Sequence, residues 1–180
     1  STADIARGLI DRDLLANAER AIERDFAAEP VLAADLHESV ARVRLALGLP
    51  QAAAAGFARV ADFRAKTLGA KAPETLGARQ QQAGALLDAA DPKQALAVAR
   101  SALRDAAALP PRDDVRIRLR MNEAEAISAL GDRPRARKLL EELRSDSLEL
   151  RGESDPATME ATNDLAILLR SGSLLTPIVL

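Results

Sequence analysis

The stretch 39–60 reads SVARVRLALGLPQAAAAGFARV and spans one turn between two predicted helices. Gly48 suits the end of the first helix, and Pro50 suits the first turn of the second. Ala41 in the first helix is followed twelve positions later by Ala53 in the second. Two antiparallel helices approach closely where the side chains between them are small. The stretch therefore predicts a tightly packed helix–turn–helix pair.

The same pattern returns along the chain with a period of 41 to 42 residues. The columns are Ala41, Ala83, Ala124 and Ala166; then Ala53, Ala95 and Ala136; then Phe57, Ala99 and Leu140; then Val60, Ala102 and Leu143. A single helix pair cannot bury its own apolar face, so repeated pairs stack on one another. The period predicts an all-α array of about three and a half helix pairs.

Helix boundaries follow from the Gly and Pro residues between the periodic segments. The predicted first helices cover 31–47, 74–89, 113–130 and 157–171, and the predicted second helices cover 50–67, 92–108 and 134–149. Residues 1–30 contain a lead-in helix that covers the first repeat, with an apolar face made of Leu14, Leu15, Ala18, Ile22 and Phe26. The array spans 31–173 and is followed by an apolar tail, 174–180. Either this tail covers the last predicted helix, or the chain is cut there.

Composition excludes several kinds of site. The 180 residues include no Cys and one His, so disulfides, thiolate zinc sites and multi-histidine metal sites are excluded. A net charge of −2 with 2% aromatic residues argues against nucleic-acid binding. No nucleotide-binding or hydrolase motif and no run of 18 apolar residues occurs. We therefore expect no enzyme, no cofactor, no metal and no membrane partner, and we interpret His37 as a structural or surface residue.

Two interhelical segments carry a further motif. Leu68-Gly69 precedes Pro73-Glu74-Thr75, and Leu150-Arg151-Gly152 precedes Pro156-Ala157-Thr158, with Asn163 in the helix that follows. Together with the Ala columns, these residues resemble the tetratricopeptide repeat (TPR) of the kinesin-light-chain type. The large aromatic positions of that family are filled here by Arg44, Leu86 and Ile127.

The resemblance implies a right-handed α-α superhelix and a protein–protein interaction module that binds an extended peptide or partner helix in a concave groove. In bacteria, similar arrays form the regulatory part of larger signalling proteins, such as serine/threonine kinases with C-terminal TPR regions. The resemblance therefore also implies a protein or peptide partner and a cytoplasmic location. A structural module that pairs through its uncapped C-terminal end, giving a homodimer, is the alternative function.

The groove residues are predicted from their spacing around the recurrent Ala on each first helix. They are Glu38, Ser39, Arg42, Gln80, Gln81, Met121, Asn122, Glu125, Asn163 and Asp164. Carboxamides offer a donor and an acceptor together, so they can pair with a peptide backbone of any sequence. In the resembled family, Asn on this face clamps extended peptides. Arg42 and Glu125 add charge selectivity, and the alternative is that all ten are solvated surface residues.

A cluster of basic residues lies in the third repeat. It comprises Arg116, Arg118, Arg120, Arg133, Arg135, Arg137 and Lys138. Glu141 and Glu142 follow Arg137 and Lys138 at helical spacings that favour ion pairs. We interpret the cluster as a salt-bridged solvent face, with phosphopeptide or nucleic-acid binding as the alternatives.

Overall fold

The computed structural model describes residues 8–173, without the side chains of 12 and 171–173. This part of the chain is helical and contains no strand, so the all-α prediction is confirmed. The predicted tail, 174–180, lies outside the described residues. None of the described helices is long and apolar enough to cross a membrane.

The chain divides into two compact units, Ser1–Asp91 and Pro92–Leu180. Unit 1 contains a π-helical turn η1 (Ile10–Leu15) and the helices α2 (Ala16–Asp25), α3 (Pro30–Ala46), α4 (Pro50–Thr67) and α5 (Pro73–Asp88). Unit 2 contains α6 (Pro92–Asp105), the 3-10 turn η2 (Ala106–Ala108), α7 (Asp114–Ala129), α8 (Arg133–Arg151) and α9 (Pro156–Ser173). The predicted helix ranges match these helices closely.

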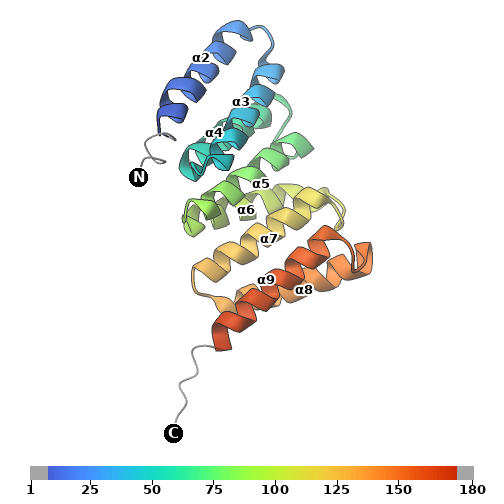
Figure 1. Cartoon of the computed structure of the whole chain (residues 1–180). Helices are drawn as coiled ribbons and strands as arrows, with labels where there is room; N and C mark the ends of the chain where they lie inside the picture. Colours follow the sequence, from blue (N-terminus) through green and yellow to red (C-terminus); the bar gives the residue numbers. More distant parts are fainter. Residues whose placement is uncertain (1–7, 174–180) are drawn as a thin grey trace. The chain divides into compact units, whose positions relative to one another are not determined.

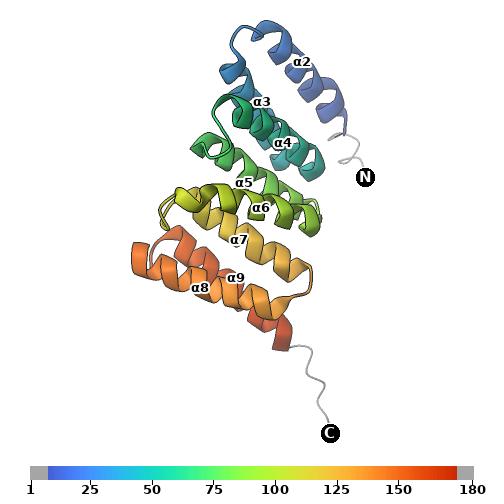
Figure 2. The same cartoon turned by 180° about the vertical axis from the view of Figure 1, so that it is seen from behind.

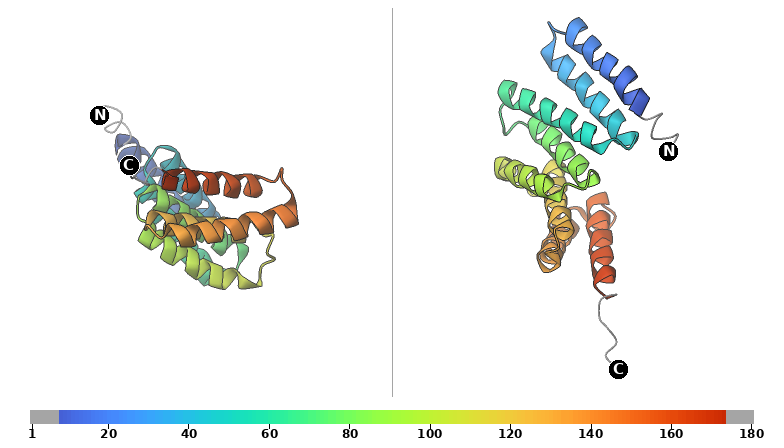
Figure 3. Two further views of the ribbon diagram at one scale, coloured as in Figure 1. Left: turned by 90° about the horizontal axis from the view of Figure 1, so that it is seen from below. Right: turned by 90° about the vertical axis from the view of Figure 1, so that its left-hand side faces the viewer.

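Within each unit the helices form consecutive antiparallel pairs. In unit 1, α3 and α5 lie at the front of Figure 1 with α4 behind them, and the right-hand view of Figure 3 shows α3, α4 and α5 in succession. In unit 2, α7 and α9 lie at the front of Figure 1, whereas α6 and α8 are at the front of Figure 2. Each unit therefore presents one face built from first helices and an opposite face built from second helices.

The turns form where the sequence predicts them. Gly48 and Gly131 end their helices with φ values of 74° and 93°, a region that L side chains rarely adopt. Ala90 takes the same left-handed conformation, with φ 55°, at the turn after α5. Pro50 and Pro73 begin the helices that follow, where the missing N–H costs no hydrogen bond. The helix α7 begins differently, because the Asp113 side chain accepts hydrogen bonds from two backbone N–H groups of its first turn.

The two Ala columns lie between paired helices. The buried members, each with no exposed surface, are Ala41, Ala83, Ala124, Ala53, Ala95 and Ala136. Gly56 faces Ala41 so closely that an added Cβ would lie 2.8 Å from the Ala41 Cβ. Ala166 of α9 is exposed, as expected for the half repeat, because none of the described helices follows α9 and packs on that face.

The lead-in segment is only partly as predicted. Leu15 and Ile22 are buried together with Val40 of α3, as an apolar face requires. Leu14 is instead 64% exposed. The physical reason is helix geometry, since adjacent residues point about 100° apart and Leu14 therefore lies to one side of the face that Leu15 and Ile22 form.

Candidate partner-binding surface

On the first-helix face of unit 1, Glu38 is part of a buried ion-pair network. Its carboxylate lies 2.6 Å from the Arg64 guanidinium and also pairs with Arg42. The Gln81 side chain donates a second hydrogen bond to it from α5, with a distance of 2.9 Å. Glu38 was predicted to face a groove, but it is 6% exposed and its oxygens hold α3, α4 and α5 together. That prediction is corrected: Glu38 acts within the unit.

The other predicted residues of unit 1 divide between this network and the surface. Gln81 is half-buried, and its carboxamide oxygen also accepts a long bond of 3.4 Å from Arg42. Gln80 is half-buried as well. Ser39 is exposed and donates its hydroxyl to the Asp35 carbonyl one turn earlier. Arg42 is exposed, so Ser39 and Arg42 are the predicted residues of this unit that a partner could reach.

In unit 2, two predicted groove residues are buried on α7. Met121 is 6% exposed and packs with Ile117, Leu143 and Ala161. Asn122 is 9% exposed. The helix α7 lies against α6, α8 and α9, so less of its surface is exposed than the spacing around Ala124 predicts. The prediction that Met121 faces a partner is therefore corrected.

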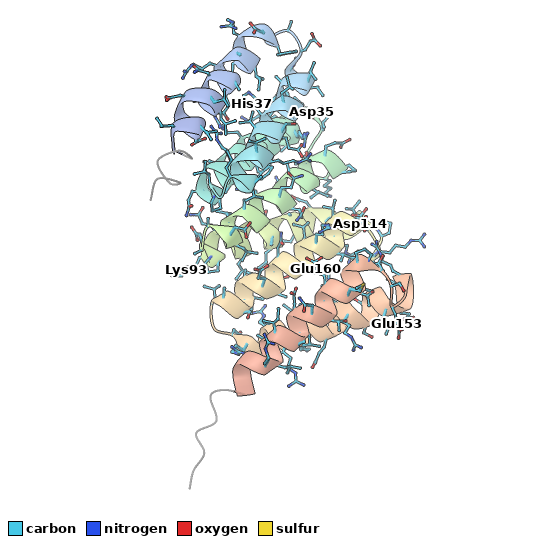
Figure 4. All side chains as sticks on the ribbon, in the orientation of Figure 1. Asp35, His37, Lys93, Asp114, Glu153 and Glu160 are labelled. Carbon is cyan, nitrogen blue, oxygen red and sulfur yellow. The ribbon has the colours of Figure 1, made fainter. Side chains whose placement is uncertain are left out.

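A cleft lies between α7 and α9, and we call it the α7–α9 cleft. Its volume is about 310 Å³. Three carboxylates line it: Glu125 of α7 with Glu160 and Asp164 of α9. Leu140 and Ile167 are among its apolar lining residues. Figure 4 shows Glu160 on α9, on the side of α7. The structure thus brings together Glu125 and Asp164, both predicted from sequence, and adds Glu160.

The carboxylates of this cleft are unevenly compensated. Burial raises the pKa of Asp164 above its ordinary value, and the negative charge of Glu160 raises it further. The nearest cation to Glu160 in the described ion pairs is Arg118, at 4.0 Å with both side chains exposed. An exposed pair at that distance contributes little. The guanidinium of Arg133 in α8 also lines the cleft and donates to the Leu168 carbonyl. The lining therefore has three carboxylates against one cation, with an apolar component.

Asn163 lies away from this cleft although it is adjacent to Asp164 in sequence. It lines a separate hollow of about 490 Å³ together with Arg144, Met159 and Thr162. The Arg144 guanidinium donates to the Thr162 hydroxyl there, with a distance of 3.1 Å. Successive residues of a helix point about 100° apart, so Asn163 and Asp164 reach different surfaces.

The sequence reasoning missed Glu160 in the cleft. A signal was available, because Glu160 and Asp164 are four residues apart and therefore share one face of a helix. Glu160 lies six positions before Ala166, whereas the predicted groove positions lie within three residues of the recurrent Ala.

Part of the basic cluster of the third repeat is paired with acidic residues. Arg137 lies 2.7 Å from Glu141, Lys138 lies 3.9 Å from Glu142, and Arg120 lies 2.7 Å from Asp146. Arg116 and Arg133 instead donate to the backbone carbonyls of Leu109 and Leu168, so the predicted salt-bridged face holds for part of the cluster. Among the described residues, no group of three or more His, Asp or Glu side chains could hold a metal ion.

Comparison with known proteins identifies relatives of the fold. No family model and no curated protein sequence matches the chain. Among solved structures, a Podosopora anserina protein of nearly identical kinesin light chain TPR-like repeats is 19% identical, with a TM-score of 0.66 over 96% of this chain and 86% of that one. A single-residue variant of it gives 0.69, over 96% and 85%.

A third similar structure is BtubC (BKLC) from P. vanneervenii, also 19% identical, with a TM-score of 0.68 over 88% of this chain. This chain covers 64% of that protein. At these identities the likeness concerns the fold alone. The chain therefore has the fold of a TPR-like array of helix pairs, as its repeat columns predict.

Proposed function

We propose that this chain is a protein-interaction scaffold, and that its α7–α9 cleft binds a partner segment carrying a lysine or arginine side chain. The observation that supports the proposal is the composition of the cleft, whose lining combines three carboxylates from two helices with apolar side chains and with Arg133 as its one cation. A long basic side chain has the complementary composition, because its methylene stem is apolar and its head is cationic.

The energetics of the cleft favour such a side chain. The stem packs on Leu140 and Ile167, and the head forms charge-assisted hydrogen bonds with Glu160 and Asp164. Burial and the charge of Glu160 both disfavour the ionised form of Asp164, so a bound cation relieves an existing repulsion. Complementary charge also selects partners, since an acidic segment is repelled.

Three further elements belong to this proposal. Ser39 and Arg42 of unit 1 and Asn163 of unit 2 are exposed, and we assign them to additional partner contacts. Regulation within a larger bacterial signalling protein and a cytoplasmic location rest on the family resemblance. The mechanism is binding without turnover, so its loss is measured as loss of affinity.

Isothermal titration calorimetry with two synthetic peptides tests the cleft. One is a short Ala-based peptide with a central Leu-Lys pair, and the other replaces that Lys by Glu. We expect measurable binding of the Lys peptide alone. The double substitution Glu160→Gln with Asp164→Asn should weaken it at least about tenfold, which is 1.4 kcal/mol.

The matched control is Glu149→Gln, because Glu149 is an exposed carboxylate of α8 outside the cleft. It should leave the affinity unchanged, and far-UV circular dichroism should show that each variant retains its helices. Equal binding of both peptides, or an undiminished affinity in the double variant, contradicts the proposal.

Self-association through α9 is the second candidate function. Met159 is 61% exposed and Leu169 is 45% exposed, which gives α9 an apolar surface on the described part of the chain. Light scattering over a range of concentrations tests it. A dimer mass that is lost on deletion of 174–180 or in Met159→Lys supports this function, whereas a constant monomer mass excludes it.

A further inference from the structure

Unit 1 contains a small apolar pocket that none of the predicted groove residues lines. It lies among α2, α3 and α4 and has a volume of about 240 Å³. Its apolar lining includes Phe26, Phe63, Ala34 and Val60. The chain has three Phe residues in all, so two of them line this one pocket. A cavity of roughly 150 Å³ already accommodates benzene, so this pocket has room for one ring with a short substituent.

Three polar side chains line the same pocket: Glu23, His37 and Arg59. His37 is half-buried, and Figure 4 shows it on α3 beside α2. Among the described residues its ring nitrogens make no hydrogen bond, and the ring interacts electrostatically with the Glu19 carboxylate. Arg59 donates one hydrogen bond, of 2.8 Å, to Glu19, which leaves further N–H groups of its guanidinium for another acceptor.

The charges of these residues define the polar part of a ligand. Glu23 is anionic, Arg59 is cationic and the imidazole of His37 can donate a hydrogen bond. A simple carboxylate would satisfy Arg59 and His37 but would face the like charge of Glu23. A simple amine would satisfy Glu23 but would face Arg59. A zwitterion with adjacent ammonium and carboxylate groups matches all three residues.

We propose that this pocket binds a free α-amino acid with a single-ring aromatic side chain, with L-phenylalanine as the probe. Its ring packs against Phe26 and Phe63, where aromatic pairs gain about 0.5–1.5 kcal/mol beyond area burial. Its carboxylate accepts hydrogen bonds from Arg59 and His37, and its ammonium group donates to Glu23. This site is independent of the α7–α9 cleft and of the partner proposed for it.

Nuclear magnetic resonance tests the proposal directly, because His37 is the one histidine of the chain and gives a single set of imidazole signals. L-phenylalanine should shift these signals and those of the Phe rings saturably. We compare 3-phenylpropanoate, which lacks the ammonium group, 2-phenylethylamine, which lacks the carboxylate, and L-alanine, which lacks the ring. Each should bind at least about tenfold more weakly than L-phenylalanine, which is 1.4 kcal/mol.

Substitution of Glu23 gives the sharpest contrast between these ligands. Glu23→Gln should weaken L-phenylalanine about tenfold and leave 3-phenylpropanoate unchanged or tighter, because only the first ligand has an ammonium group. Ala33→Leu, which fills the pocket from α3, should abolish binding of both. The matched control is Glu74→Gln, an exposed carboxylate of α5 that does not line the pocket.

Three results overturn the proposal. They are the absence of a saturable His37 shift with L-phenylalanine, equal affinity for 3-phenylpropanoate or 2-phenylethylamine, and an unchanged L-phenylalanine affinity in Glu23→Gln. Because Glu23 is exposed, its substitution should not affect folding, and circular dichroism checks this for every variant. Loss of the peptide affinity of the α7–α9 cleft has no bearing on these results.

Discussion

The helices α3 of unit 1 and α7 of unit 2 fill the same repeat position with side chains of opposite character, and the third residue of this column, Leu86 of α5 in unit 1, is apolar. Arg44 of unit 1 and Ile127 of unit 2 occupy equivalent positions, two repeat periods apart. Both are buried, with 6% and 3% of their surface exposed. The Arg44 guanidinium donates to Asp11 at 2.6 Å and to Glu19 at 2.7 Å, whereas Ile127 packs with Leu140 and Leu168.

The difference shows that this position requires burial and a matched cover, and that it does not require an apolar side chain. In unit 1 the cover comes from η1 and α2, which supply carboxylates. In unit 2 it comes from α8 and α9, which supply Leu side chains. A buried charge is tolerated only where it is paired and hydrogen-bonded. The cover in unit 1 is therefore held by ion pairs to Arg44 in addition to the apolar contacts of Leu15 and Ile22, whereas in unit 2 it is held by apolar packing around Ile127.

The largest expected effect on stability comes from placing an Arg, as at position 44 of unit 1, at the equivalent position 127 of unit 2. Ile127→Arg puts a guanidinium among Leu140, Leu168 and Ala136, with no carboxylate in that cluster. We expect a loss of about 3–5 kcal/mol in the free energy of unfolding, as for an uncompensated buried charge. Urea denaturation followed by circular dichroism measures it.

The converse substitution is the control. Arg44→Ile removes the ion pairs, but Glu19 keeps Arg59 at 2.8 Å and Asp11 is partly exposed. Removal of one partner of a buried ion pair costs about 3–5 kcal/mol when the other charge is left uncompensated. Because Arg59 still compensates Glu19, the loss should be smaller, about 2 kcal/mol or less. Equal losses for the two swaps would show that partner chemistry does not distinguish the units.

A second contrast concerns how closely the paired helices approach. The repeat position that holds Gly56 in unit 1 holds Val98 and Leu139 in unit 2. Because a Cβ at Gly56 would lie 2.8 Å from the Ala41 Cβ, Gly56→Ala should cost about 1–3 kcal/mol. Gly77→Ala in α5 meets no atom within 4 Å and should stabilise by up to about 1 kcal/mol. If Gly56→Ala leaves the thermal unfolding temperature unchanged, the close approach of α4 to Ala41 does not require a glycine, which contradicts this prediction.

A third contrast lies in the two Pro-x-Thr segments. The Thr75 hydroxyl donates to the Gly69 carbonyl at 2.9 Å, whereas the Thr158 hydroxyl is buried and has no hydrogen-bond partner among the residues that the structure describes. Thr75→Val should therefore cost about 1 kcal/mol, and Thr158→Val should be neutral or stabilising. Paired denaturation curves test this difference, and an equal cost at both positions contradicts it.

The smallest effect is an opposite pH dependence of two carboxyl groups. Burial alone raises the pKa of Glu19, but the hydrogen bond and charge of Arg44, with the charge of Arg59, outweigh burial and hold it below 4.5. Its stabilising contribution is therefore present above pH 4.5 and is lost as the pH falls through the lower folded value. The pKa of Asp164 is raised above 3.8, first by burial and then by Glu160. Ionised Asp164 therefore destabilises unit 2 as the pH rises through its folded value.

Variants separate these two contributions. At neutral pH, Glu19→Gln should lower the urea midpoint and Asp164→Asn should raise it, and both differences should shrink as the pH falls toward 3. A pH-independent difference for either variant would show that its carboxyl group does not titrate with the stated shift.

Much of the fold could be predicted because local signals agree along the chain. Gly48, Gly131 and the Pro residues mark helix ends, and the Ala columns mark where paired helices meet. The site could be predicted only in part. Glu125 and Asp164 reach one cleft, but Met121 is in the core and Glu38 is held by Arg64, because exposure depends on how many helices cover each face.

The helices, their pairing and the repeat period can be predicted from the amino-acid sequence, since each follows from residues close together in the chain. Which polar side chains are available to a ligand depends instead on how the helices pack in the folded units. The Arg44–Glu19 pair and the α7–α9 cleft each join residues from different helices. Whether each charge stabilises or destabilises the fold depends on its solvent exposure and its neighbours. Those neighbours are set by helix packing within each unit, which no local pattern contains.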